Sequence, residues 1–265
     1  MNRFKLDGPY KGYDNLELWD SNSEIKCVVD SHVFGNTETN PDKQVLLLVE
    51  PRTILPTVYD FVPSVAHRYK YVFTHDSKLL KELPNAKPVI WCSVWRRCEN
   101  PEKTKLISMI SSDKMACELH VARKNLAEKY KGKIDTYGTF DGGPYVDPIV
   151  TLENYMYSVA IENQIDDIWF SEKILNCFST KTIPVYLGAR DIDKYFNKDG
   201  IVMCRDVGEL EMYINYIADH PEKAKELYNE KKQAIEENFE LSKKYASFED
   251  LFYKTYEKEI EGMFK

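Results

Sequence analysis

The pair Glu172-Lys173 stands where an apolar-periodic segment begins, directly after Ser171. This pattern predicts the first turn of a helix, which offers backbone N–H groups without intrahelical partners and the positive end of the helix dipole. The ammonium group of Lys173 adds a full charge, so the position suits a diphosphate, and the carboxylate of Glu172 suits the vicinal hydroxyls of a ribose. Ordinary helix capping with a solvated lysine would explain the same residues. Both interpretations stay open at this point.

The surrounding segment, residues 157–190, carries further polar groups at predicted strand ends. A strand predicted at 155–161 ends at Glu162-Asn163, and a strand predicted at 184–188 ends in a tight turn. In open α/β sheets, ligands bind at the carboxyl ends of the strands, so polar residues directly after strands are the candidates for function. These residues are Glu50, His75, Ser111, Ser112, Gly138, Glu162, Asn163 and Gly188.

Apolar runs alternate with helical periodicity along most of the chain, which is typical of parallel sheets joined by right-handed crossovers. The predicted strands are 45–49, 71–73, 89–91, 106–110, 134–138, 155–161, 184–188 and 201–204. Helices are predicted near 79–83, at 119–130, from 171 onward, from Asp206 with Glu209 as its capping-box partner, and from Pro221 to about Phe239.

The polar, proline-containing segment 99–105 is the best candidate for a linker. We therefore expect an α/β fold of two Rossmann-like domains facing a cleft. The N-terminal domain would cover residues 1–100, and the C-terminal domain would cover residues 101–245. The tail, residues 246–265, is amphipathic and is predicted to be a helix that packs on the body.

The composition narrows the functional classes. A formal net charge of −7 gives no electrostatic footprint for nucleic acid. The six cysteines form no CxxC pair and stand mostly in apolar stretches, which predicts buried free thiols in a reducing compartment rather than a zinc site. No run approaches the length of a membrane span, and the N-terminus has no apolar leader. We expect a soluble, cytoplasmic protein, with an anchor removed by truncation as the open alternative.

Residues 161–188 resemble the donor-binding motif of the α-1,3-fucosyltransferase family (family 10-like, GT-B). The family pattern is close to F-E-N-S/T, then after a short spacer Y-V-T-E-K-I, followed by I-P-(I/V)-Y-x-G. The matching letters here are IENQ at 161–164, WFSEKI at 169–174 and IPVYLG at 183–188. Among the departures are Ile161 for Phe, Trp169 for Tyr and Ser171 for Thr. Earlier in the chain, Arg123 and residues 134–138 are similar to the family's helix arginine and V-D-x-Y-G.

This resemblance implies an inverting glycosyltransferase that transfers a sugar from a nucleotide-diphosphate donor, GDP-fucose, to a hydroxyl of a glycan acceptor. Trp169 lies where the family places an aromatic residue near the nucleotide, so another donor such as UDP-xylose stays open. The residues implied are Arg123 and Lys173 for the diphosphate, Glu172 for the ribose, Asn163 and Trp169 for the sugar and base, and Glu50 as the base that takes the acceptor's proton.

Other interpretations compete with this one. His75 and Asp76, at another predicted strand end, are the alternative bases. A non-catalytic nucleotide- or glycan-binding module would keep the fold and lose the base. A two-domain periplasmic-type binding protein is disfavoured by the missing signal peptide.

Asp191-Ile192-Asp193 fits the D-x-D pattern that binds a divalent metal in the other major glycosyltransferase fold. Here it opens a predicted helix, and N-capping by an acidic residue explains it better. We therefore predict no essential metal and no cofactor, the nucleotide sugar being a co-substrate. Trp95-Arg96-Arg97 is the main basic cluster of the N-terminal domain. It is predicted to be a solvated interdomain surface, with contact to a phosphate or an acidic acceptor as the alternative.

Overall fold

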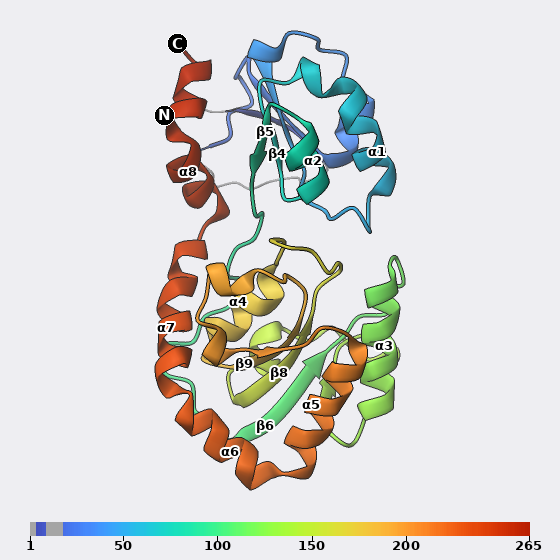
Figure 1. Cartoon of the computed structure of the whole chain (residues 1–265), viewed down its shortest axis with the longest axis vertical. Coiled ribbons are helices and arrows are strands. Elements are labelled where there is room, and N and C mark those ends of the chain that lie inside the picture. Colours follow the sequence, from blue (N-terminus) through green and yellow to red (C-terminus); the bar gives the residue numbers. More distant parts are fainter. Residues whose placement is uncertain (1–3, 9–17) are drawn as a thin grey trace. The chain divides into compact units, whose positions relative to one another are not determined.

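The computed structural model describes residues 4–8 and 18–265, and the chain forms two compact units (Figure 1). Unit 1 comprises the residues up to Trp91 together with Ser247–Lys265, and unit 2 is Cys92–Ala246. The C-terminal tail therefore belongs to the same unit as the N-terminal residues.

Unit 1 is built on a parallel sheet with the strand order β1-β2-β3-β4-β5. Helix α1 (Pro56–Val65) joins β3 to β4, and α2 (Ser77–Glu82) joins β4 to β5. Because the strand order does not reverse from β2 to β5, right-handed connections between these strands lie on one face of the sheet. The strands are β1 (Lys5–Asp7), β2 (Lys26–Val29), β3 (Gln44–Leu47), β4 (Val72–Thr74) and β5 (Ala86–Pro88).

In this unit, one strand was predicted at the wrong position and one helix was not predicted. In place of the strand predicted at 89–91, the structure has β5, Ala86–Pro88. Its partner strand β4 ends at Thr74, which pairs with Pro88, because the chain after Thr74 turns into α2. Helix α1 was not predicted. Its interior Pro63 removes a backbone donor and masks the helical pattern.

Helix α8 (Phe248–Met263) covers the second face of this sheet (Figure 1). Successive residues of a strand point to opposite faces. Leu46 of β3 packs with α1, whereas Leu47 packs with Phe252 of α8. The ring of Phe252 meets Phe73 of β4 edge-on, with 4.7 Å between the centroids. The two faces of one sheet are thus buried by helices from opposite ends of the chain.

Unit 2 contains a second parallel sheet, with the order β10-β9-β8-β6-β7. The order reverses between β6 and β8, because β7 lies on one side of β6 and all later strands lie on the other. Such a switch point leaves a crevice at the carboxyl ends of the two strands, where open α/β sheets bind their ligands. The strands are β6 (Lys105–Ile110), β7 (Asp135–Tyr137), β8 (Tyr155–Ile161), β9 (Ile183–Leu187) and β10 (Val202–Met203).

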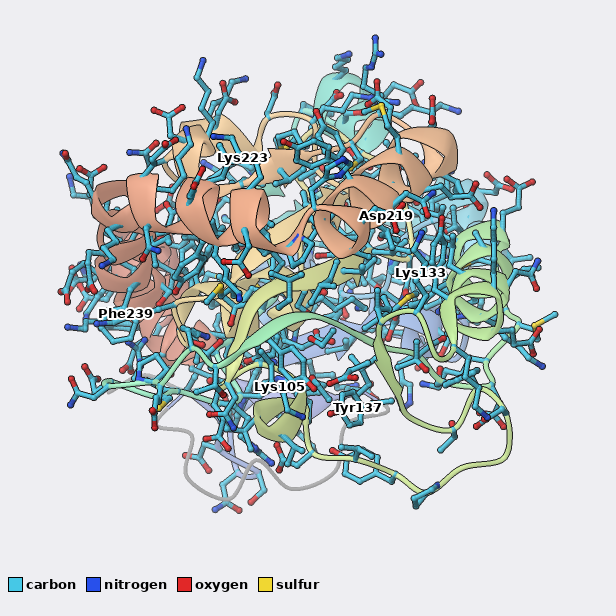
Figure 2. All side chains as sticks on the ribbon, turned by 90° about the horizontal axis from the view of Figure 1, so that it is seen from below. Lys105, Lys133, Tyr137, Asp219, Lys223 and Phe239 are labelled. Atoms are coloured by element: carbon cyan, nitrogen blue, oxygen red, sulfur yellow. The ribbon has the colours of Figure 1, made fainter. Side chains whose placement is uncertain are left out.

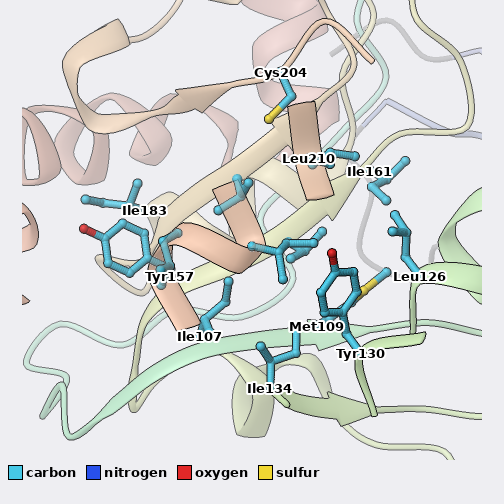
Figure 3. Packing of buried hydrophobic residues seen from close by; sticks show 14 of the residues in the cluster. Ile107, Met109, Leu126, Tyr130, Ile134, Tyr157, Ile161, Ile183, Cys204 and Leu210 are labelled. Atoms are coloured by element: carbon cyan, nitrogen blue, oxygen red, sulfur yellow. The ribbon is translucent and has the colours of Figure 1, made fainter. Parts of the chain in front are cut away.

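Helices cover both faces of this sheet. Helices α3 (Glu118–Tyr130), α5 (Val207–Asp219) and α6 (Pro221–Glu230) pack on one face, and α4 (Glu172–Phe178) follows β8 on the other. Figure 3 shows the core of the first face, where Met109 of β6 and Ile161 of β8 meet Leu126 of α3 and Leu210 of α5.

The ends of α5 carry polar anchors. Asp206 caps its start by accepting the N–H of Glu209 at 2.9 Å. The carboxylate of Glu209 accepts the N–H of Arg205 at 2.8 Å, one residue before the expected capping-box position. At the other end, the ammonium of Lys133 lies 2.9 Å from Asp219 (Figure 2), where a cation also favours the helix dipole.

The single charged helix predicted from Pro221 to Phe239 is in fact two helices, α6 and α7 (Lys232–Ser242). The chain leaves helical geometry at Lys231, whose φ and ψ are −91° and 8°. Each helix has its own anchor: the hydroxyl of Tyr228 donates to the carbonyl of Lys181, and the amide of Asn238 donates to the carbonyl of Asn197. The bend at Lys231 lets both anchors form.

We expect the substitution Phe252→Ala to destabilise unit 1 by about 3–5 kcal/mol, because it removes a buried ring from the interface between α8 and the sheet. Native-state hydrogen exchange of the β3 and β4 amides measures this loss. The matched control is Phe34→Ala, at a phenylalanine that is 50% exposed, which should change stability by about 0.5 kcal/mol or less. Equal effects of the two substitutions would contradict the assigned role of α8.

Candidate functional site

Three segments of unit 2 meet at the switch point between β6 and β8. The end of β8 supplies Glu162 and Asn163, the start of α4 supplies Glu172 and Lys173, and α3 supplies Arg123. Hydrogen bonds link β8 to both helices, as described below. The structure thus brings together four of the residues predicted for the donor site, and adds Glu162 to them.

Glu162 is a fully buried carboxylate that fixes the start of α4. It accepts the backbone N–H of Ser171 at 2.9 Å and the hydroxyl of Ser171 at 2.6 Å. The ammonium of Lys173 lies 3.5 Å from the same carboxylate and 3.4 Å from Glu172. A buried carboxylate needs such partners, because burying it unpaired would cost several kcal/mol.

Lys173 is held as a cation. Burial alone would lower the pKa of its ammonium, but Glu172 and Glu162 outweigh that effect and raise the pKa above its usual value. Its side chain keeps 23% of its surface exposed, so it is paired with the two carboxylates rather than solvated.

The helix start offers fewer N–H groups than the sequence predicts. The N–H of Lys173 is accepted by the hydroxyl oxygen of its N-cap, Ser171, at 3.3 Å, and the N–H of Ser171 is accepted by Glu162. The capping interpretation therefore holds for these groups. Attraction of an anion at this point falls to the side chains of Lys173 and Arg123.

Arg123 is a half-buried cation whose hydrogen-bond partners are neutral. Its guanidinium donates to the carbonyl of Ile161 at 3.2 Å and to Oδ1 of Asn163 at 3.1 Å. Within residues 4–8 and 18–265, no carboxylate forms an ion pair with it. Burial lowers the pKa of Arg123, and Glu162 opposes that shift only in part. A cation in this position favours an anion supplied from outside the chain.

His120 and Cys117 belong to the same face of α3, and the sequence analysis missed both. Nε2 of His120 lies 2.9 Å from Oδ1 of Asn163, and the thiol of Cys117 lies 3.3 Å from its carbonyl oxygen. Cys117, His120 and Arg123 are spaced three residues apart, so they follow one helix face. This three-residue spacing could have indicated from the sequence that Cys117 and His120 lie near the end of β8, as Arg123 was predicted to.

Gly188 is required by the buried carboxylate. A Cβ atom on Gly188 would lie 2.5 Å from Cγ of Glu162 and 2.4 Å from the hydroxyl of Tyr186. The Tyr186 hydroxyl accepts the N–H of Ala189 at 3.0 Å and lies 3.5 Å from Glu162. The turn after β9 is therefore shaped around Glu162.

Gly138 and Ser111 have a structural role at neighbouring strand ends. The N–H of Ser111 donates to the carbonyl of Tyr137 at 2.9 Å. Gly138 has a φ of 102°, and a Cβ atom there would lie 2.1 Å from the carbonyl oxygen of Ser111. Only glycine fits this contact.

Trp169 lies in the loop between β8 and α4, and it is 4% exposed. The loop is held from the other side by residues that follow β9. The N–H of Arg190 donates to the carbonyl of Asp166, and the N–H of Asp191 to that of Asp167, both at 2.8 Å. The predicted contact of Trp169 with sugar or base stays a prediction.

The capping role predicted for Asp191 is wrong. It stands at the start of a short 3-10 helix, Ile192–Lys194, but its side chain accepts no capping hydrogen bond. Instead, its carboxylate forms an ion pair with the ammonium of Lys194, three residues along the chain, at 2.6 Å. In the part of the chain that the structure describes, no three His, Cys, Asp or Glu side chains are grouped to hold a metal ion.

Arg96 is exposed and Arg97 is partly buried, and both make contacts inside unit 2. Arg96 forms a two-pronged ion pair with Asp147, with the closest atoms 2.6 Å apart. Arg97 lies over the ring of Phe239, 5.0 Å from its centroid. Trp95 remains exposed.

Unit 1 carries the three predicted base candidates. Glu50 follows β3, is partly exposed, and its backbone N–H donates to buried Asp30 at 3.4 Å. His75 is fully buried, and burial lowers its pKa to about 4. Asp76 is also buried, caps α2 through the N–H of Leu79, and accepts two hydrogen bonds from Arg52. Of the three candidates, Glu50 is the one that is not buried.

The family model for glycosyltransferase family 10 (fucosyltransferase), C-terminal part, matches residues 100–257, which is more than half of the chain. The chain belongs to glycosyltransferase family 10. It is a glycosyltransferase, which excludes the periplasmic-type binding protein, and family membership implies a nucleotide-sugar donor and a glycan acceptor. No curated protein sequence matches this family 10 chain at a significant level.

Solved structures similar to this family 10 member are glycosyltransferases. An α1,3-fucosyltransferase with GDP is 14% identical, is matched over 91% of this chain and 79% of its own, and gives a TM-score of 0.53. TarM is 12% identical, and the match covers 88% of this chain and 54% of TarM, with a TM-score of 0.54. The pneumococcal O-GlcNAc transferase GtfA, in complex with UDP and GlcNAc, is 10% identical. The match covers 91% of this chain and 57% of GtfA, with a TM-score of 0.54.

At these identities the structural similarity shows the fold alone. It confirms the predicted α/β architecture with two parallel sheets, the GT-B type. Among the described residues, no helix is long and apolar enough to cross a membrane.

We expect Glu162→Gln to destabilise unit 2 by about 1–3 kcal/mol, because the amide leaves buried partners unsatisfied and removes a charge that balances Lys173. The thermal midpoint of unfolding measures the change. Glu172→Gln, at a carboxylate whose side chain is 24% exposed, is the matched control and should cost about 0.5 kcal/mol or less. If the control loses as much stability, Glu162 is not the group that fixes the start of α4.

Proposed function

We propose that this family 10 glycosyltransferase transfers fucose from GDP-fucose to a hydroxyl of a glycan acceptor with inversion, and that the donor diphosphate binds Arg123 and Lys173. The observation that carries the proposal is the half-buried Arg123 at the switch point, whose partners are the neutral oxygens of Ile161 and Asn163. Phosphate oxygens would supply the missing negative charge in the geometry that a guanidinium prefers.

Lys173 and Glu172 complement Arg123 from the other side of β8. The ammonium of Lys173 would stabilise the charge that develops on the leaving diphosphate as the bond to the sugar breaks. Glu172, partly exposed at the first position of α4, would accept hydrogen bonds from the ribose hydroxyls. Asn163 and Trp169 would contact the sugar and base.

GDP-fucose is the favoured donor because the matching family is described as fucosyltransferases. One similar structure is an α1,3-fucosyltransferase with GDP, whereas another is an O-GlcNAc transferase with UDP, so this fold serves both bases in other proteins. Trp169, which stands where the family motif has tyrosine, supports a different donor such as UDP-xylose as the second candidate.

Glu50 is the proposed catalytic base. In an inverting transfer, the acceptor oxygen forms a bond to the anomeric carbon while the bond from that carbon to the diphosphate oxygen breaks. The carboxylate takes the proton of the acceptor hydroxyl, and the diphosphate leaves with the bonding electrons. Its partial exposure at a strand end supports Glu50 over buried His75 and buried Asp76.

Two variants separate donor binding from turnover. Lys173→Ala should weaken GDP-fucose binding at least about tenfold, since a charge-assisted contact is worth about 1.5–3 kcal/mol, while Lys194→Ala, at an exposed ion pair, should leave it unchanged. Glu50→Gln should keep donor affinity and lose at least about a hundredfold in turnover. Calorimetry with a panel of nucleotide sugars and a transfer assay give both quantities. Normal affinity in Lys173→Ala rejects the donor site, and surviving turnover in Glu50→Gln rejects the base.

Two cations at the diphosphate support a transfer that needs no metal, and no cofactor is proposed. We expect full activity in excess chelator, measured with the same transfer assay. Loss of activity that manganese restores would contradict this prediction. Asp191→Asn and Asp193→Asn would then test the D-x-D segment.

A further inference from the structure

We propose that Trp95 and Tyr145 form an aromatic platform in unit 2 that binds a neutral sugar ring of the glycan acceptor. The inference rests on the proposed function and adds to it the acceptor side of the reaction. The two side chains are 55% and 75% exposed. A single exposed aromatic ring is ordinary on a protein surface, but these two belong to segments that share one ion pair and adjoin the proposed donor site.

Trp95 is carried by a segment that is fixed along α4. Oδ1 of buried Asn176 accepts the backbone N–H of Trp95 at 2.9 Å and that of Arg96 at 3.1 Å. Directly after α4, the hydroxyl of Ser179 donates to the carbonyl of Arg96 at 2.6 Å, and the carbonyl of Ser179 accepts the N–H of Cys98 at 3.0 Å. The backbone that carries the Trp95 ring is therefore held in place by the protein, which reduces the entropy lost on binding.

The same segment begins beside the proposed donor site. Burial raises the pKa of the Cys92 thiol well above its usual value, and the charges of Glu162 and Glu172 raise it further, so the thiol lies near both carboxylates. Asn176, which anchors Trp95, stands four residues after Glu172 in α4, a rise of roughly 6 Å along the helix. The anchor of Trp95 is thus about one helical turn from the residue proposed to bind the ribose.

Tyr145 is carried by the loop that follows β7. A Cβ atom on Gly143 would lie 2.9 Å from the carbonyl oxygen of Gly138, so the loop folds back closely on its own start. Gly138 in turn packs against Ser111, which follows β6. The loop with Tyr145 therefore leaves the sheet at the carboxyl ends of its strands, the same edge at which the proposed donor site lies.

One ion pair connects the two aromatic residues. Arg96 follows Trp95 directly, and its guanidinium binds the carboxylate of Asp147, with the closest atoms 2.6 Å apart. Nη1 of Arg96 also donates to the carbonyl of Trp95 at 2.8 Å. The pKa of Arg96 is raised mainly by Asp147 and to a smaller extent by the hydroxyl of Tyr145, which therefore lies near the guanidinium. The pair thus joins the segment that carries Trp95 to the loop that carries Tyr145.

The chemistry of this surface favours a neutral sugar. The face of an aromatic ring is negative and attracts the positively polarised C–H groups on the face of a sugar ring. Sugar hydroxyls both donate and accept hydrogen bonds, so they can bind the guanidinium and the carboxylate of the ion pair. Because Asp147 already balances the charge of Arg96, an acidic sugar would gain little attraction and would meet a like charge. The acidic acceptor considered from the sequence is therefore disfavoured.

Substitution of the rings tests the platform. Trp95→Ala and Tyr145→Ala should each raise the KM for a neutral oligosaccharide acceptor at least about tenfold and leave the affinity for GDP-fucose unchanged. Trp95→Phe keeps an aromatic ring and should raise the KM by less than about threefold. The matched control is Tyr216→Ala, at an exposed tyrosine of α5, which should change neither quantity.

The measurements use the full chain. An array of neutral and acidic oligosaccharides, incubated with the enzyme and GDP-fucose, identifies the acceptor, the transfer assay gives its KM, and calorimetry gives the donor affinity. If GDP-fucose binds but only acidic oligosaccharides, or none, accept the sugar, the inference is overturned and the donor site stands. Equal KM values in Trp95→Ala and Tyr216→Ala, or a matching loss of donor affinity in Trp95→Ala, would also overturn it. If the wild-type protein binds no nucleotide sugar, the proposed function fails, and the inference fails with it.

Discussion

The switch point of unit 2 depends on one buried carboxylate, that of Glu162. It accepts two hydrogen bonds from Ser171 and lies beside the ammonium of Lys173. Because a buried charge is tolerated only with its partners in place, the end of β8 and the start of α4 must form together. Gly188 completes the arrangement, since any side chain there would collide with the carboxylate. The motif residues Ser171, Lys173 and Gly188 are therefore linked, because each of them packs against or pairs with Glu162.

Around this anchor, the two cations of the site differ in how they are balanced. Lys173 is shared between two carboxylates, which keep it charged and in place. Among the described residues, Arg123 donates to neutral oxygens and forms no ion pair, and burial lowers its pKa. The charge of Lys173 is thus balanced by carboxylates of the protein, whereas that of Arg123 is not.

The sequence predicts what is local. Apolar runs predict β8 and β6, and the polar N-cap Ser171 predicts the start of α4, because these features depend on neighbours in the chain. The boundary of β5 and the bend at Lys231 depend on distant partners, and both were predicted wrongly.

The same division holds for the candidate site. Arg123, Asn163, Glu172 and Lys173 are brought together as predicted, but a composite motif was needed to connect them across three elements. His120 was missed because a single histidine in a helix is chemically ambiguous until its neighbours are known. The roles assigned to these residues, and to Glu50, stay predictions.

Helix α8 also affects how the chain reaches its folded state. The ribosome makes β1 to β5 first, then the whole of unit 2, and only then the helix that covers Leu47 and Phe73. Unit 2 is continuous and can close before α8 is made, whereas unit 1 is completed only when α8 joins its sheet. Until then one apolar face of its sheet remains uncovered, and such surfaces favour aggregation. Folding of unit 1 therefore depends on the rate at which α8 is made, or on a chaperone that shields the sheet until then.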